Sequence, residues 1–572
     1  MTPFRDMPLK KSQLKTPSRV TASSQPVDTS QLRRDRLGTL VSQLISKFHS
    51  SSSWEAFVNE FRGRSYLATE LDNIEHPAAE LLQKWRDEGV PALSDSPPWT
   101  KEQKDHCIQR GCHQSAKEHA EFLREEMAEF IESKFWVVLP SNLIQDEEDI
   151  MFSPAAVKDE QNRKPRLLCD HSWQWLGWDS VNESTVPHAP PEAMQFGLTL
   201  PRLLWLLRHA NPKFGPPKTN KQDLKDGFYR LFLRARDCLR LAIILPKYED
   251  EPQLIAIPLA CTMGWVQSPP SFCVMSETVC DVANSSIRSN ASLPPHRLDE
   301  EAAASDDYDM SWNPRSLGDE DAQADMTLLS VAGVQELPPE PDEIAPPSNR
   351  PLNRPLGTTD VFVDDFIQVA QGGPKRLTKI RRHLFSAIDK VLDQPLPGET
   401  HRNEAVSLKK LRKGDGSWGT RKEILGWLID TVRQTIELPP HRKQTLASIF
   451  TDLASRKRVS NKAWQRYLGQ LRFVSTAIPG CRGFFSALQL AHVRANGNRV
   501  RINSTLRSHI DAFASLAASL AHRPTHLAEI VPQEPSFFGT TDAAKPGMGG
   551  IFYDYNEVPH VWRQPFPADI QA

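Results

Sequence analysis

The charges of this sequence are segregated along the chain, and one acidic segment is poorly suited to any folded core. From Asp299 to Glu343 there are fourteen Asp and Glu residues against one Arg, a net charge of −13. High charge with few β-branched residues cannot offset the entropy that is lost on ordering. We therefore expect an acidic disordered insert at residues 296–350.

The segment that follows carries the opposite charge. Between Phe366 and Ile530, 28 Lys and Arg residues stand against 11 Asp and Glu, a net charge of +17. The segment also has the apolar periodicity of folded helices. A folded surface with this excess is typical of polyanion binding, because each neutralised phosphate releases condensed counterions. The alternative is a basic domain whose charge serves only solubility.

Length and composition define the class of protein. The chain has 572 residues, enough for three or four domains, and 39% of them are hydrophobic. The eight Cys are irregularly spaced and no apolar run follows the basic start, so neither a disulfide framework nor a signal peptide is indicated. No stretch approaches the ~20 apolar residues of a membrane helix. We expect an intracellular protein, cytoplasmic or nuclear, without a membrane partner.

Periodicity and turn residues predict the order of helices and strands. Amphipathic helices are expected at 37–61, 76–88, 114–134, 195–210, 271–285, 375–392 and in most of 441–521. Strands are expected at 135–140, 165–170, 227–233, 238–245, 253–260, on both sides of a tight Asp-Asp turn in 359–370, as a hairpin in 424–439, and in three runs near the C-terminus.

Three acids are the strongest candidates for chemistry. Asp223 opens the segment DLKDGF at the start of an expected strand, and Asp364 and Asp365 lie between apolar residues in FVDDF. Each alone is most often a turn or capping residue. Together, carboxylates from two neighbouring hairpins can hold two Mg²⁺ ions ~3.5–4 Å apart, which stabilise the attacking and leaving oxygens in nucleotidyl transfer.

A glycine-containing loop, MGWVQSPPSF (Met263–Phe272), lies between these acids in the sequence. Gly264 has no side chain, so a nucleotide or template base could approach the backbone closely. Asp223 and Gly264 are 41 residues apart, and Gly264 and Asp364 are 100 apart. The second spacing falls to about 45 when residues 296–350 are set aside.

Taken in order, DLKDGF, GWVQSPPSF and FVDDF resemble palm motifs A, B and C of retrotransposon reverse transcriptases, especially those of tyrosine-recombinase-type and LTR elements. PRLLCD at 165–170 resembles the preceding fingers strand, ILGWLID at 424–430 the primer-grip hairpin, and TTDAAKPGMGG at 540–550 the first strand of an RNase H domain. The resemblance covers roughly residues 76–572. It implies a right-hand fingers-palm-thumb fold of the α+β class and template-directed DNA synthesis by two-metal-ion nucleotidyl transfer.

The resemblance also implies roles for particular residues. The catalytic acids and ligands of two Mg²⁺ ions would be Asp223, Asp364 and Asp365. The residues that bind the incoming dNTP would be Arg166, Phe228, Met263 and Gly264. Arg166 would pair with the triphosphate through its planar, charged fork, and Phe228 would block a ribose 2′-OH. From the residues alone, Arg166 as a solvated strand residue and Phe228 as a core aromatic remain open.

Three features depart from the pattern of the family. Met263 stands where some relatives carry Gln, Phe362 replaces the usual Tyr of motif C, and the acidic insert precedes the motif C strand. The insert is the departure that favours a rival interpretation, a catalytically decayed remnant that only binds nucleic acid. An RNA polymerase built on the same palm is disfavoured by Phe228.

Two further clusters have open interpretations. The basic run Lys409, Lys410, Arg412 and Lys413 is either a solvated loop or a contact to template-primer phosphates. His106, Cys107, Cys112, His113 and His119 lack a second matching ligand pair, which disfavours a zinc site. Trp464, Tyr467 and Phe473, at helical spacing, are expected in a core.

These features divide the chain into eight parts. The expected parts are a disordered basic arm at 1–36, a helical region at 37–134, fingers at 135–222, palm with motifs A and B at 223–295, the acidic insert at 296–350, palm with motif C and primer grip at 351–437, a helical thumb or connection at 438–530, and a truncated RNase H-like segment at 531–572. The partners would be an RNA or DNA template-primer and dNTPs, and the oligomeric state stays open.

The RNase H-like segment is expected to lack RNase H activity. Asp542 resembles the first metal-binding acid of such a domain, but two-metal cleavage needs several carboxylates that converge on one site. The later acids Asp554, Glu557 and Asp569 fall in an expected hairpin turn or near the end of the sequence.

Overall fold

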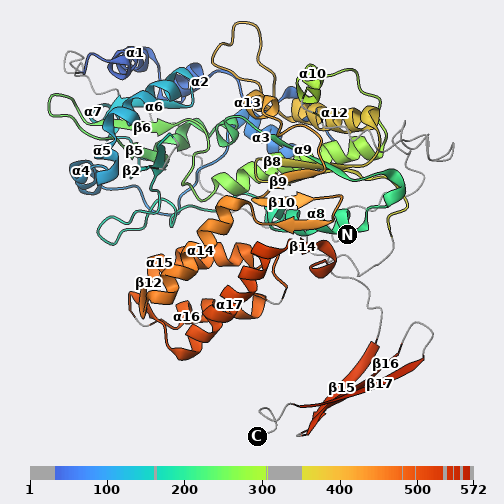
Figure 1. Cartoon of the computed structure of the whole chain (residues 1–572). Helices are drawn as coiled ribbons and strands as arrows, with labels where there is room; N and C mark the ends of the chain where they lie inside the picture. The colour runs from blue at the N-terminus through green and yellow to red at the C-terminus, as the bar shows by residue number, and fades with distance from the viewer. Residues whose placement is uncertain are drawn as a thin grey trace, which may run out of the picture. The chain divides into compact units, whose positions relative to one another are not determined.

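Figure 1 shows the computed structural model of the chain. The chain contains two compact units. The structure describes residues 32–159, 164–304, 306, 351–479, 481–495, 497–531, 538–544, 546–553 and 558–566. Unit 1 comprises the described residues of Met1–Met194, Leu224–Val282 and Ala387–Ser407, and unit 2 comprises those of Gln195–Asp223, Ala283–Ser386 and Leu408–Ala572. No helix in the described part is both long and apolar enough to cross a membrane.

Unit 1 is built from helices and one mixed sheet. Its helices are α1 (Arg36–Ser50), α2 (Trp54–Arg62), η2 (Thr69–Asn73), α3 (Ala79–Glu88), α4 (Lys101–Arg110), α5 (Gln114–Glu118), α6 (Ala120–Glu132), α7 (Ser141–Ile144), η5 (Gly227–Arg230), η6 (Ala235–Leu241) and most of α9 (Ser268–Arg288). Its strands are β1 (Trp136–Pro140), β2 (Phe152–Lys158), β3 (Arg166–Cys169), β5 (Ala242–Ile244) and β6 (Leu254–Pro258).

The sheet of unit 1 has the order β1-β6-β5-β2-β3, with one parallel pair, β2 and β5. Strands β1 and β6 read as continuous apolar runs and are buried along their whole length. Such runs are typical of strands that are covered on both faces. Helix α6 directs Leu123, Met127 and Ile131 into this core, as their spacing predicts.

Unit 2 contains the remaining elements. Its helices are η3 (Gln195–Leu198), α8 (Thr199–His209), η4 (Pro212–Phe214), the end of α9, α10 (Asp299–Ala303), most of α12 (Pro374–Val391), α13 (Leu408–Arg412), α14 (Pro440–Ser455), α15 (Asn461–Val474), α16 (Cys481–Val493), α17 (Ser504–His522) and η8 (Leu527–Glu529). Its strands are β4 (Lys218–Asp223), β7 (Gly357–Phe362), β8 (Asp365–Ala370), β9 (Arg421–Ile424), β10 (Trp427–Asp430), β11 (Thr435–Glu437), β12 (Arg458–Ser460), β13 (Arg499–Arg501), β14 (Thr525–His526), β15 (Phe538–Ala544), β16 (Gly547–Tyr553) and β17 (Pro559–Pro565).

A three-stranded antiparallel sheet of order β4-β8-β7 carries the candidate site. Its first strand is polar yet mostly buried, so its side chains need partners. Asn220 donates to Gln368 Oε1 at 3.1 Å, and Gln368 donates to Thr359 Oγ1 at 3.0 Å. This chain of hydrogen bonds runs across all three strands and favours a single register.

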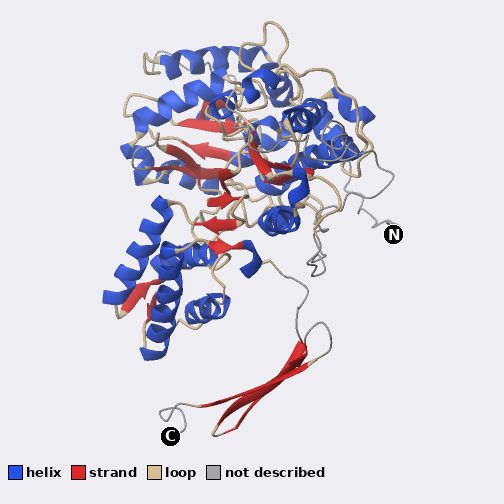
Figure 2. Cartoon of the chain, turned by 45° about the vertical axis from the view of Figure 1, so that its right-hand side comes forward, coloured by secondary structure: helices blue, strands red, loops and turns tan. Residues whose placement is uncertain are grey.

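The helical region of unit 2, residues 440–522 (Figure 1), packs into a larger apolar core that also includes residues of α8, β8, β9, β10 and β11. Trp464 and Tyr467 of α15 are buried in this core, which confirms that expectation for these two residues. Figure 2 shows the helices of this region beside a short two-stranded ribbon, formed by β12 and β13. The sheet β14-β11-β10-β9 connects to the same core through Ile429 and Ile436.

The last described strands form a meander of order β15-β16-β17, as the three C-terminal runs predict. Each strand of this meander leaves most of its described side chains exposed or half-buried. Asp542 lies on β15 opposite Gly549, and no other acid among the described residues stands beside it in the register.

Most of the expected elements are confirmed, including the mixture of helices with mainly antiparallel sheets expected of the α+β class. Three local predictions are wrong. Asp223 ends a strand and does not open one. Residues 227–230 form a 3₁₀ helix, because buried Arg230 donates to the carbonyls of Lys225 and Glu404. The first half of 238–245 is likewise helical, as the end of η6, with a strand only at 242–244.

The start of the expected acidic insert is also ordered. Residues 299–303 form α10, and the carboxylate of Asp306 lies fully buried against Arg381, with an Nη1–Oδ1 distance of 2.7 Å. Asp299 pairs with Arg382 in the same way, at 2.7 Å. A count of charges along the sequence misses such ion pairs, because the partner arginines on α12 lie more than 70 residues further along the chain. Residues 305 and 307–350, like most of the basic arm, lie outside the described residues.

Candidate functional site

Strand pairing brings the three predicted acids of unit 2 together. Asp223, the last residue of β4, stands directly opposite Asp365, the first residue of β8. Asp364 precedes Asp365 in the turn of the β7-β8 hairpin. Directly opposed residues in an antiparallel pair have Cβ atoms about 4.5–5.5 Å apart. The register therefore assembles a cluster of three carboxylates at one end of this sheet.

The turn that carries Asp364 is strained. Val363 has a φ of 57°, a left-handed conformation that a β-branched residue rarely adopts. Such a residue costs on the order of 1–3 kcal/mol, and strain of this kind concentrates at functional sites. The strain is tolerated here because six ladder pairs hold β7 on β8. The turn leaves the Asp364 side chain exposed.

A buried ion pair anchors the strand beside this turn. Arg202 of α8 donates to both carboxylate oxygens of Asp360 on β7, at 2.7 and 2.6 Å. Both side chains are about nine-tenths buried. This bidentate geometry fixes direction as well as distance, so helix α8 orients the hairpin from its buried side.

Two lysines lie against the acids. Lys410 of α13 contacts Asp223, with 2.5 Å between Nζ and Oδ1. Lys221 lies two residues before Asp223, on the same face of β4, and its Nζ is 3.9 Å from Asp365 Oδ1 and 3.8 Å from Asp415 Oδ2. The cluster therefore combines three carboxylates with two ammonium groups.

Burial makes two of these acids, Asp365 and Asp223, harder to ionise. Burial raises the pKa of Asp365 to about 6, opposed by the charge of Lys221 and reinforced by Asp364 and Asp223. Burial also raises the pKa of Asp223, against the hydrogen bond from Lys410. The Lys410 ammonium is opposed by burial, but the hydrogen bond to Asp223 and the nearby acids raise its pKa. Burial is thus the main cause of both raised carboxyl pKa values, while the neighbouring lysines act in the opposite direction.

The donor chemistry of the cluster fits Mg²⁺. Carboxylate oxygens are the ligands this hard cation prefers, usually one or two together with waters and substrate phosphates. Within the described residues, no group of three or more His, Cys, Asp or Glu side chains is arranged to hold a metal ion. The donor types are therefore present, but the side chains do not form a closed ligand set, and Lys410 supplies the positive charge beside Asp223.

The expected nucleotide loop lies in unit 1, where Gly264 has a φ of 99°. A Cβ atom at this position would lie 2.2 Å from the carbonyl oxygen of Cys169 on β3. The glycine thus permits a close approach by the backbone of the chain itself. Asn182 holds the same loop, since its Nδ2 donates to Gly264 O at 2.8 Å and its Oδ1 accepts from Val266 N at 2.9 Å.

The other residues of the expected nucleotide site also lie in unit 1. The ring of Phe228, half-buried on η5, packs edge-to-face against Phe272 of α9 with centroids 5.2 Å apart. Arg166 is exposed on β3, and Met263 is 57% exposed. Phe228 therefore has a fixed position, while Arg166 and Met263 are accessible.

The basic run divides into two groups of residues. Lys410 contacts Asp223, and Arg412 pairs with Glu301 of α10 at 3.0 Å. Lys409 and Lys413 are exposed. Most of the run therefore lies on a short helix, all four side chains are exposed, and two of them contact acids of the same unit.

Sequence reasoning missed several residues that support the site. Lys221, Arg202 and Asn182 belong to this group, and so does Lys422. The Nζ atom of Lys422 donates to the carbonyls of Gly414 and Asp415 in the loop beside β4, and burial lowers its pKa to about 8. The one available signal was the polar strand KTNKQD, in which Lys221 and Asp223 share a face.

Comparison with known proteins finds similarity only among solved structures. No protein-family model matches the sequence, and no curated protein matches it. A structure of the foamy viral protease-reverse transcriptase dRH in complex with ds DNA is 13% identical, with a TM-score of 0.41 over 89% of this chain and 68% of that chain.

Two further structures of the foamy viral protease-reverse transcriptase give similar values. The complex with RNA/DNA hybrid is 14% identical, with a TM-score of 0.40. The similarity covers 90% of this chain and 52% of that chain, so this chain spans about half of the length of that protein. The complex with dsDNA is 14% identical, with a TM-score of 0.40 over 90% of this chain and 81% of that chain.

Proposed function

We propose that the chain is a reverse transcriptase, an RNA-directed DNA polymerase that extends a primer by nucleotidyl transfer. The observation that carries the proposal is the register of β4 on β8, which sets Asp223 opposite Asp365 with Asp364 in the adjoining turn. Asp223 and Asp365, which lie 142 residues apart in the sequence, thereby share one end of a sheet. In the proposal this sheet belongs to the palm of a fingers-palm-thumb polymerase, and the helical region 440–522 is its thumb.

Asp223, Asp364 and Asp365 would hold two Mg²⁺ ions, which stabilise the attacking and leaving oxygens of phosphoryl transfer. The chain itself supplies orientation and charge. The Arg202–Asp360 pair holds β7, so the turn keeps Asp364 in place. Lys221 offsets part of the negative charge beside Asp365. In unit 1, Phe228 would select deoxyribose by exclusion, and Arg166 would bind the triphosphate.

Primer extension by the purified full chain tests the proposal. The assay uses Mg²⁺, dNTPs and a primer annealed to an RNA template. We expect extension by the parent chain and a loss of at least about a thousandfold in Asp364→Asn, because a lost metal ligand removes several kcal/mol of charge stabilisation and each 1.36 kcal/mol is tenfold in rate. Asp415→Asn is the matched control, since Asp415 is a neighbouring acid outside the proposed ligand set.

Equal extension by the parent chain and Asp364→Asn would contradict the assignment of the acids. A parent chain without any extension, but with intact binding of the template-primer, would instead favour the decayed remnant. The contact between Lys410 and Asp223 is the observation that favours this second function, because an ammonium group at 2.5 Å occupies one oxygen of a proposed metal ligand.

The variant Lys410→Met separates the two functions. If the chain is an enzyme, removal of the lysine frees Asp223 and lowers the Mg²⁺ concentration needed for half-maximal extension. If the chain is a remnant, Lys410→Met leaves extension absent at every Mg²⁺ concentration. Lys409→Met, an exposed neighbour on the same helix, controls for the loss of one positive charge.

A further inference from the structure

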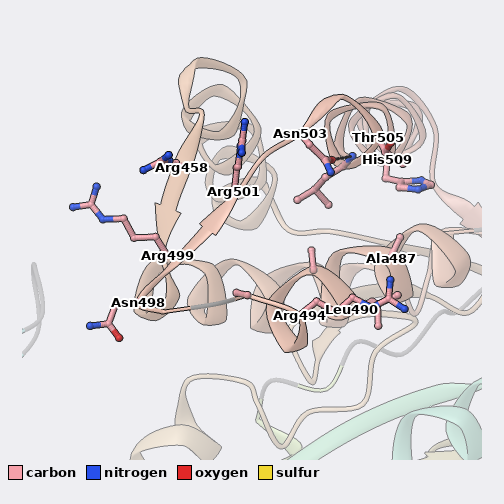
Figure 3. A pocket seen from close by; sticks show the side chains of 13 residues that line it. Arg458, Ala487, Leu490, Arg494, Asn498, Arg499, Arg501, Asn503, Thr505 and His509 are labelled. Carbon is pink, nitrogen blue, oxygen red and sulfur yellow. Dashed lines mark hydrogen bonds between the residues drawn. The ribbon is translucent and has the colours of Figure 1, made fainter.

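A pocket of about 890 Å³ lies in the helical region of unit 2 and shares no lining residue with the acidic cluster. Figure 3 shows its walls, which come from the β12-β13 ribbon, α16 and the start of α17. The volume lies within the range of about 300–1,000 Å³ that is typical of small-ligand sites. The pocket therefore has room for a nucleotide-sized group.

The ribbon presents its positive charges on one face. Val459 and Val500 are opposed in the ladder and only 1% exposed, so that face packs on the core. Side chains alternate between the two faces of a strand. Arg458, Arg499 and Arg501 therefore share the other face, and all three line the pocket.

The register of the ribbon creates electrostatic repulsion. Arg458 stands directly opposite Arg501, and like charges in that position destabilise an antiparallel pair. Arg494, which directly follows α16, adds a fourth guanidinium group to the lining, and none of the described residues that line the pocket is Asp or Glu. None of these four arginines forms an ion pair within the described residues. A bound anion would therefore relieve a repulsion that no acid in the described part of the chain neutralises.

Guanidinium groups are well suited to bind phosphate. Their planar forks give paired hydrogen bonds to phosphate oxygens. Several arginines spread around one pocket match several phosphates in succession better than one isolated ion. The spacing of charges thus favours a ligand that carries repeated phosphates.

The floor of the pocket is apolar. Ala487, Leu490 and Ala491 of α16 line it, and Leu490 is 44% exposed, which is high for a large aliphatic residue. A nucleobase can cover such a floor with its flat face, while guanidinium planes can stack on it from the rim. A base inside a duplex is already stacked and paired, so only an unpaired base can lie there.

We propose that this pocket binds a short single-stranded segment of nucleic acid, with its phosphates on the arginines and a base on the aliphatic floor. The site does not depend on polymerase activity, because it shares no residue with the acidic cluster. It would hold an unpaired strand of RNA or DNA, whereas a duplex would contact only the arginines at the rim.

Fluorescence anisotropy with the full chain tests this proposal, without Mg²⁺ or dNTPs so that the result is independent of catalysis. The probes are a labelled ten-nucleotide oligothymidine and a blunt hairpin duplex with the same number of phosphates. We expect Arg499→Gln/Arg501→Gln to weaken single-strand binding at least about tenfold. Two lost phosphate contacts should also lower the salt slope by roughly 1.4, at about 0.7 per phosphate for a single strand.

Two further variants keep the test specific. Lys462→Gln/Arg472→Gln removes two exposed charges of α15 outside the pocket and should change single-strand affinity less than about twofold. Leu490→Asp places a carboxylate on the exposed floor and should weaken single-strand binding while the thermal unfolding midpoint stays within a few degrees of the parent value.

Three outcomes would overturn the proposal. Single-strand affinity that is the same in Arg499→Gln/Arg501→Gln and the control would remove the pocket as the site. Equal weakening of the single strand and the duplex would remove the preference for unpaired bases. Inorganic tripolyphosphate that displaces the oligonucleotide at the same phosphate concentration as unlabelled oligothymidine would show a site for phosphate alone.

Discussion

The buried pair Arg202–Asp360 should be essential for the stability of the sheet that carries the acids. Replacing Arg202 with Met leaves the Asp360 carboxylate about nine-tenths buried without its two charge-assisted hydrogen bonds. Removing one partner of a buried pair costs about 3–5 kcal/mol, because the remaining charge is uncompensated. We expect Arg202→Met to lower the free energy of unfolding of unit 2 by this amount.

A double-mutant cycle supplies the control. Arg202→Met combined with Asp360→Leu removes both charges, and replacement of a whole buried pair by apolar side chains is often neutral. The double variant should therefore be more stable than either single variant by at least about 2 kcal/mol. Urea unfolding followed by far-UV circular dichroism, fitted for each variant, measures these differences. Additive losses in the double variant, or a loss below about 1 kcal/mol in Arg202→Met, would refute the reasoning.

Three further predictions concern unit 1. Gly264→Ala should lower the free energy of unfolding of unit 1 by at least about 2 kcal/mol, because φ is 99° and the new Cβ would meet the carbonyl of Cys169. The thermal unfolding midpoint of unit 1 should fall accordingly, and an unchanged midpoint would contradict the packing of this loop. Burial lowers the pKa of His171 to about 3, so below pH 6.5 the unfolded state binds a proton that the folded state excludes. This group alone should lower the free energy of unfolding by roughly 1.6 kcal/mol between pH 6.5 and 5, and urea titrations at both pH values should show this contribution removed in His171→Asn. Phe228→Ala should admit ribonucleotides in primer extension if its ring excludes the 2′-OH, and unchanged discrimination would assign the selection to another residue.

The sequence predicted best what depends on neighbouring residues. The hairpin of FVDDF followed from two apolar runs around a two-residue turn, although the turn is Val363–Asp364 rather than the expected Asp-Asp pair, because Asp365 already belongs to β8. The helix at 374–391 followed from its apolar spacing in the same way. These features need no knowledge of distant partners.

Features that depend on distant partners could not be predicted. Lys410 was grouped with its basic neighbours, but its partner Asp223 lies 187 residues away. The apolar run at 227–233 is typical of a strand, yet Arg230 bonds to carbonyls near residue 404 and bends the chain into a 3₁₀ helix. Asp306 sits in a segment whose charge predicts disorder, but Arg381 compensates it in the core. In each case a tertiary contact overrides the local preference.

Metal binding by the acidic cluster tests the central claim most directly. Titration with Mn²⁺ in place of Mg²⁺, followed by electron paramagnetic resonance in the presence of template-primer and a non-hydrolysable dNTP, counts the bound ions. The account predicts two bound ions per chain in the parent protein and a loss of at least one in Asp223→Asn and in Asp364→Asn, with Asp415→Asn unchanged. The same number of bound ions in the parent chain and both variants would contradict it.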